Sequence, residues 1–169
     1  MRSVKFAIGL VAVVVFHLVA VRLFGEVSSF VDLFLVLALF NALDGSLVAG
    51  LLGGMIAGLA ADTFTGGLYG LHGFADTIAG YGMAVASRRL VIQKSGGVLL
   101  AFSLAAAVQQ AIVIGLRMLL LPETALPTLV GLVARILGVG VLGFLGHVGR
   151  QRWVRGVARW RSNRRARLR

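Results

Sequence analysis

The sequence predicts an all-α integral membrane protein, built as a bundle of six transmembrane helices. Hydrophobic residues make up 59% of the 169 residues and the mean hydropathy is +0.95, whereas soluble domains are roughly 45 to 50% apolar. The apolar residues fall into six runs, and nine of the 17 Lys and Arg residues follow the last run. A soluble core of this length would leave about a third of the chain's surface exposed. Lipid is therefore expected to cover the excess apolar surface.

A helix needs roughly 20 apolar residues to cross a hydrocarbon core about 30 Å thick. The runs that reach or approach this length are residues 4–24, 30–44, 46–62, 71–87, 97–121 and 128–148. Residues 1–24 carry Arg2 and Lys5 before a long apolar stretch and look like a signal peptide, but no clear cleavage site follows, so we expect an uncleaved span. The second and third runs are short and only Asp44-Gly45 separates them. They could be two tightly turned spans or a re-entrant hairpin.

The Lys and Arg residues predict the orientation, since short loops rich in these residues stay in the cytoplasm. Fourteen of the 17 lie at the N-terminus as Arg2 and Lys5, in the loop of Arg88, Arg89 and Lys94, or in the tail. The loops on the opposite side carry only two acidic residues and no basic one. We therefore expect one membrane domain over residues 1–149 and a basic tail over residues 150–169, with both termini in the cytoplasm. This distribution indicates membrane topology and argues against a nucleic-acid partner.

Small residues recur at spacings of three and four in the third run: Gly50, Gly53, Gly54, Ala57, Gly58 and Ala61. On a helix they form one smooth stripe, along which another backbone can approach closely. The stripe could pack inside the protein. Alternatively, it could be a docking groove for the membrane helix of a partner, centred on Gly50, Gly54 and Gly58 and extended by Phe64 and Tyr69.

Polar residues within the apolar runs predict a buried polar network. His72 and Asp76 share one face of the fourth run, and Asp76 is expected to point into the bundle because a carboxylate facing lipid is costly. At about 1.5 Å per residue, Arg135 lies at the height of Asp76, which predicts an ion pair between them. The predicted members are His17, His72, Asp76, Gln109, Gln110 and Arg135. The network could fix the helix register or belong to a proton or ion pathway, although the inner half offers only Asn41 and Asp44.

The stretch DTFTGGLYGLHGFAD, residues 62–76, interrupts the apolar runs. Asp62 at a helix end can accept hydrogen bonds from the N–H groups of the turn that follows, and Gly66 and Gly70 permit the positive φ angles of such a turn. We predict a helix-to-helix turn at the outer surface, in which polar side chains satisfy backbone groups near the membrane.

The longer run LLGGMIAGLAADTFTGGLYGLHGFADTIAGYG resembles the central signature of the MreD family. That family carries an apolar Gly-rich helix, an aspartate, a Ser/Thr-Gly turn, a second glycine, a Leu-His or Leu-Asn pair and a later Gly-Tyr. The matching positions here are Asp62, Thr65-Gly66, Gly70, Leu71-His72 and Gly80-Tyr81. A Pro-Leu pair that is common before the second glycine is replaced by Leu68-Tyr69. The resemblance covers about residues 30–121.

The resemblance implies a non-enzymatic scaffold in the bacterial cytoplasmic membrane that binds MreC. Through MreC it would connect to a peptidoglycan glycosyltransferase and transpeptidase, with MreB filaments on the cytoplasmic side. It also implies the six-helix fold of the substrate-binding subunits of energy-coupling-factor vitamin transporters. The rival function is therefore a substrate-binding membrane subunit of a small-molecule transporter.

No catalytic, cofactor or metal site is predicted, because the chain has no cysteine and none of the motifs H-E-x-x-H, G-x-S-x-G or G-x-G-D. The basic tail carries Trp153, Val157 and Trp160 on one helical face with arginines around them. This pattern is typical of a segment that binds anionic lipid headgroups. A topology anchor with a disordered end is the alternative.

Overall fold

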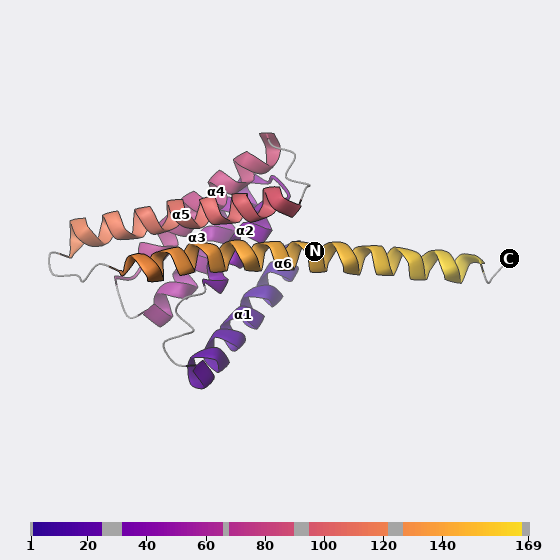
Figure 1. Cartoon of the computed structure of the whole chain (residues 1–169), viewed down its shortest axis with the longest axis horizontal. Helices are drawn as coiled ribbons and strands as arrows, with labels where there is room; N and C mark the ends of the chain where they lie inside the picture. The colour runs from indigo at the N-terminus through magenta and orange to yellow at the C-terminus, as the bar shows by residue number, and fades with distance from the viewer. Residues whose placement is uncertain (1, 25–31, 66–67, 90–94, 122–126, 167–169) are drawn as a thin grey trace.

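The computed structural model describes residues 2–24, 32–65, 68–89, 95–121 and 127–166, and the regular elements in these ranges are all α-helices. They are α1 (Arg2–Phe24), α2 (Leu33–Ala42), α3 (Leu47–Thr65), α4 (Leu71–Arg89), α5 (Ser95–Leu120) and α6 (Leu129–Ala166) (Figure 1). Four helices contain a segment long and apolar enough to cross a membrane: Ser3–Leu23, Leu47–Thr65, Gly96–Leu120 and Leu129–Trp153. The six predicted segments are therefore confirmed as helices, and the chain is a multi-pass membrane protein.

Helix α2 is shorter than the span predicted over residues 30–44, since it has only ten residues. At 1.5 Å per residue it is about 15 Å long, which is about half of the hydrocarbon thickness, so α2 does not cross the membrane by itself. Its first turn is capped by the buried Asp32, whose Oδ1 accepts a hydrogen bond of 3.0 Å from the Leu35 N–H. A capping carboxylate satisfies N–H groups that a helix starting inside the bundle would otherwise leave unpaired.

The connection between α2 and α3 is the tight turn predicted at Asp44-Gly45. Gly45 has a φ of 72°, which a residue with a side chain rarely adopts. Asn41 Nδ2 donates a 2.8 Å hydrogen bond to the Ala49 carbonyl across the turn, and Arg88 Nε at the end of α4 donates to the Gly45 carbonyl. The turn is therefore tied to both helices that it joins and to α4.

The short helix α2 is the centre of the bundle, since it contacts each of the other five helices. Leu35 and Leu39 of α2 are fully buried, and they belong to an apolar cluster with Met83 of α4, Phe102 of α5 and Val139 of α6. This cluster fills the half of the bundle that lies toward the α2–α3 turn.

Helices α3 and α4 pack with their backbones in contact along the glycine stripe. A Cβ atom built on Gly50 would lie 2.5 Å from the Gly80 carbonyl oxygen, and Cβ atoms on Gly54 and Gly58 would overlap the backbones of Asp76 and His72. Glycine at these positions lets van der Waals contacts and weak Cα–H hydrogen bonds replace side-chain packing. The glycine stripe therefore serves the internal packing of α3 against α4.

The docking groove predicted at Gly50, Gly54 and Gly58 is wrong, because these three residues are buried against α4 of the same chain. A partner helix cannot reach them without displacing α4. Phe64 and Tyr69 have exposed fractions of 39% and 68%, so the part of that prediction that rests on them stays a prediction.

Helices α1 and α6 form the periphery. α1 leans away from the other helices in Figure 1, and its contacts with the bundle run through Phe6, Leu10, Val13 and Val14, which pack on a cluster of α2 and α3 residues. α6 continues as one rod well beyond the other helices and ends near the C-terminus. Its side chains are described as far as Trp153, so the predicted face of Val157 and Trp160 lies outside the described side chains.

The α3–α4 contact predicts opposite effects of one substitution at two glycines. Gly54→Ala is expected to lower the free energy of unfolding by about 1–3 kcal/mol, because the added Cβ overlaps the Asp76 backbone. Gly115→Ala in α5 is the control: nothing lies within 4 Å of a Cβ at this position, and alanine should stabilise the helix by up to about 1 kcal/mol. Unfolding titrations with SDS measure both values. Equal effects at the two positions would contradict the backbone contact.

Candidate functional site

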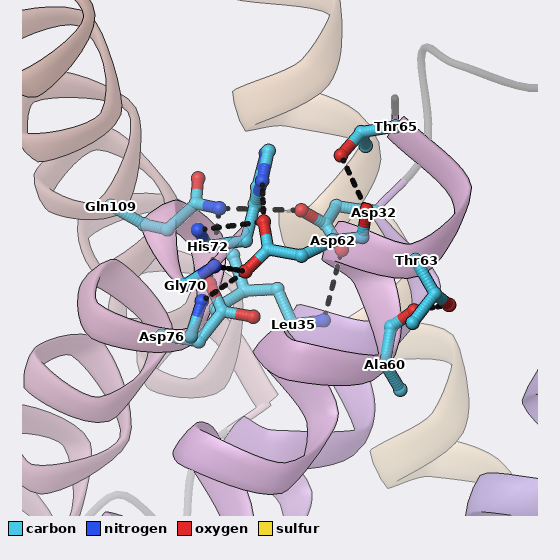
Figure 2. A network of polar contacts seen from close by, with 11 residues as sticks. Asp32, Leu35, Ala60, Asp62, Thr63, Thr65, Gly70, His72, Asp76 and Gln109 are labelled. Atoms are coloured by element: carbon cyan, nitrogen blue, oxygen red, sulfur yellow. Dashed lines mark hydrogen bonds and ion pairs between the residues drawn. The ribbon is translucent and has the colours of Figure 1, made fainter. Parts of the chain in front are cut away.

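The carboxylate of Asp62, near the end of α3, binds the N-terminus of α4 (Figure 2). Oδ2 accepts hydrogen bonds from the N–H groups of Gly70, at 2.9 Å, and Gly73, at 3.1 Å, while Oδ1 accepts one from the His72 N–H at 3.0 Å. Gly70 has a φ of 96°, which turns the chain toward this carboxylate. The predicted role of Asp62 is confirmed, although Gly66 of the same predicted turn lies outside the described residues.

The imidazole of His72 adds a fourth contact to the same carboxylate. Its Nδ1 lies 2.8 Å from Asp62 Oδ1, and both side chains are almost completely buried. In the tautomer that carries its hydrogen on Nδ1, the ring donates a hydrogen bond to this carboxylate. The carboxylate of Asp62 therefore contacts three backbone N–H groups and one imidazole ring at the start of α4. These four contacts fix its position at the α3–α4 junction.

A second cluster lies farther inside the bundle and is centred on Gln109 of α5. The Nε2 group of Gln109 donates to Asp76 Oδ1 at 3.0 Å and to Asp32 Oδ2 at 3.3 Å. Gln109 and Asp76 are fully buried, and Asp32 is 6% exposed. One amide group thus joins the beginning of α2, the first half of α4 and the middle of α5 (Figure 2).

The two clusters leave three buried polar atoms without a hydrogen-bond partner among the described residues: His72 Nε2, Asp76 Oδ2 and Gln109 Oε1. Unpaired polar atoms in an apolar interior are costly, and ordered water often satisfies such groups. Farther along the same helices the bundle interior is apolar, at Leu39, Met83 and Phe102. Among the described residues, Asp32, Asp62, His72, Asp76 and Gln109 therefore form two neighbouring clusters and not a series across the membrane, which a proton or ion pathway would need.

The predicted ion pair between Asp76 and Arg135 is wrong. No hydrogen bond or ion pair within 4.0 Å joins these two described residues, and Arg135 Nε has no partner there. Helix α6 packs against α5 and α2, whereas Asp76 faces Gln109 and Asp32. An equal depth along two helices, on which the prediction rested, does not determine which neighbour a side chain faces.

Two other predicted members of the network lie beside it. His17 of α1 packs in an aromatic cluster, with ring centroids 5.5 Å from Phe34 and 5.2 Å from Phe64. Gln110 is buried next to Gln109 but makes no hydrogen bond to the other described polar residues of the site. The sequence thus identified the polar residues of α4 and α5 that meet, but assigned the remaining members to α1 and α6, whereas the structure takes them from α2 and α3.

Asp32 was missed as a site residue, because the sequence places it inside an expected apolar span. The available signal was its position directly before an apolar run of eight residues, 33–40, since aspartate is a preferred N-cap. In the part of the chain that the structure describes, no group of three or more His, Asp or Glu side chains is arranged to hold a metal ion. The geometry is that of a structural polar core: it joins α2, α3, α4 and α5 and fixes their relative positions.

A comparison with models of protein families matches residues 1–135 to the family described as rod shape-determining protein MreD. No curated protein and no solved structure matches the chain. The matched range covers α1 to α5 and the first turns of α6, and it includes every residue of the polar core.

The hydrogen bonds of Asp62 predict a large effect of a small substitution. Asp62→Asn keeps the size of the side chain but turns an NH₂ group toward backbone donors, so we expect a loss of about 2–4 kcal/mol in the free energy of unfolding. The matched control is Asp44→Asn, because Asp44 is half exposed and lies 3.6 Å from Arg150, a kind of ion pair that contributes less than about 1 kcal/mol. SDS titrations of both variants measure the difference. A loss at Asp62 no larger than at Asp44 would refute the role of Asp62.

Proposed function

The chain belongs to the MreD family of rod shape-determining proteins, and on this premise we propose that it is a scaffold subunit of the bacterial rod-shape complex that binds MreC. The family is one of non-catalytic cell-shape membrane proteins. The match over residues 1–135 is the observation that carries the proposal. MreC is a protein with a single membrane helix and an extracytoplasmic domain, so its contact is expected within the membrane and at the outer surface.

The docking surface is proposed around the α3–α4 connection. Four large apolar side chains are exposed there: Phe64 at 39%, Leu68 at 41%, Tyr69 at 68% and Phe74 at 55%. Aromatic residues are enriched at the centres of protein interfaces, and exposed clusters of them mark interaction sites. The Asp62 carboxylate lies directly beneath this connection and holds Gly70 and Gly73. The surface is therefore presented on a rigid support, which lowers the entropic cost of binding.

The burial of the polar core favours a scaffold function over a catalytic one. Asp32, Asp62 and Asp76 each accept hydrogen bonds from groups of the same bundle, and all are buried. A group that acts on a substrate must be reachable by it. The interactions instead hold four helices in one arrangement, which is what a platform for partner proteins needs.

The orientation with both termini in the cytoplasm is part of the proposal. Arg88 bonds the turn between α2 and α3, and Arg150 of α6 lies 3.6 Å from Asp44 of the same turn. The end of α4 and the start of the basic tail therefore lie at one end of the bundle. The positive-inside rule assigns this end to the cytoplasm. There the tail would contact anionic lipids, and MreB filaments would be neighbours of the complex.

We propose that MreC connects the protein to the peptidoglycan glycosyltransferase and transpeptidase. From the family we also expect the fold of the substrate-binding subunits of energy-coupling-factor transporters. A transporter subunit is the rival function. It requires a pocket that is polar, aromatic and open to the outside, so saturable binding of a small molecule by the purified protein would favour it over the scaffold.

The proposed docking surface predicts where photocrosslinkers will capture the partner. An unnatural crosslinking residue at Phe64 or Tyr69 is expected to form an adduct with MreC in cells, because both side chains are accessible, with exposed fractions of 39% and 68%. The control position is Leu119, near the end of α5, which is 79% exposed but not part of the surface. Immunoblots against MreC read out the adducts. Adducts at Leu119 and none at Phe64 or Tyr69 would refute this surface.

A further inference from the structure

An apolar groove of about 500 Å³ lies between α4 and α5, and its lining residues belong neither to the polar core nor to the proposed docking surface. It exists because both helices present small residues to each other: Ala79, Gly82 and Ala86 on α4, and Gly97, Ala101 and Ala105 on α5. Leu100 and Leu104 also line it, with exposed fractions of 69% and 68%. We propose that this groove binds one acyl chain of an anionic phospholipid whose headgroup pairs with Arg89.

The length of the groove fits one leaflet of a bilayer. Its lining extends from Ile78 to Ala86 on α4 and from Gly97 to Val108 on α5. At 1.5 Å per residue these stretches are about 12 Å and about 17 Å long, and one leaflet contributes about 15 Å of hydrocarbon. A transmembrane helix of a partner protein would need a groove along the full thickness.

The other half of the α4–α5 interface is closed. Leu71 and Ala75 of α4 pack there against Val113 of α5, and all three are buried, with Ile112 and Leu116 beside them. A ligand in the groove therefore ends near the middle of the membrane. This favours an acyl chain, which ends at the same depth, over a helix that continues across.

Charge complementarity selects an anionic headgroup. Arg89 is three residues beyond Ala86 and seven beyond Gly82, so it lies on the same face of α4 as the groove. Its side chain is exposed and makes no hydrogen bond or ion pair with other described residues, whereas the neighbouring Arg88 is bound to the Gly45 carbonyl. Arg89 follows the last lining residue of α4 by about one helical turn, which is the level at which the phosphate group of a lipid in the groove is expected.

The inference is tested by lipid binding to the purified full-length protein, with phosphatidylglycerol and phosphatidylcholine as probes and native mass spectrometry as readout. We expect about a fivefold preference for phosphatidylglycerol, which Arg89→Gln removes. Gly82→Leu fills the groove, and nothing lies within 4 Å of a Cβ at this position, so the variant is expected to fold and to bind at least tenfold less phosphatidylglycerol. Gly115→Leu, at an equally open position outside the groove, is expected to bind like the unsubstituted protein.

Three results would overturn the inference. The first is binding by Gly82→Leu that equals binding by Gly115→Leu. The second is an unchanged headgroup preference in Arg89→Gln. The third comes from a photocrosslinking residue at Leu104: capture of a protein at this position in cells, and not of phospholipid, would assign the groove to a partner helix. The Gly82 and Arg89 results do not depend on MreC, so their failure leaves the proposed scaffold function standing.

Discussion

The first backbone N–H groups of α4 lie inside an apolar bundle, and this constraint determines much of the structure. A helix leaves its first four N–H groups without partners, and here His72 and Gly73 are buried, so bulk water cannot satisfy their N–H groups. Asp62 accepts hydrogen bonds from Gly70, His72 and Gly73, and thereby allows α4 to begin where it does. Since Asp62 belongs to α3, the same hydrogen bonds fix α3 against α4.

The register that Asp62 sets continues along both helices. With increasing distance from Asp62 along α3, the contacts are Gly58 with His72, Gly54 with Asp76 and Gly50 with Gly80. At each of these turns the backbones of α3 and α4 are in contact, with no side chain between them. With this close approach, the Asp76 side chain reaches Gln109, which also holds Asp32 of α2. The polar core and the glycine contact therefore belong to one arrangement, and the exposed surface at the α3–α4 connection rests on it.

Much of the fold followed from the sequence, because membrane solvation imposes simple rules on length and hydrophobicity. These rules predicted six helices and the turn at Asp44-Gly45, and turn chemistry predicted the role of Asp62. The rotation of each helix about its axis did not follow, since composition and depth carry no information about it. For this reason the predicted pairing of Asp76 with Arg135 was wrong. The predicted docking groove was wrong for the same reason, because the glycine stripe faces α4 of the same chain. Asp32 was missed because a buried helix start inside a membrane protein has the same apolar surroundings as a span.

Amide hydrogen exchange of the unsubstituted protein in lipid nanodiscs tests the central claim most directly. If Asp62 satisfies the start of α4, the amides of Gly70, His72 and Gly73 should exchange as slowly as those in the middle of the helix. The amide of Gly131, in the first turn of α6, is an internal reference, because its partner Thr128 is exposed and the hydrogen bond is 3.3 Å long. Exchange at Gly70, His72 and Gly73 as fast as at Gly131 would contradict the account.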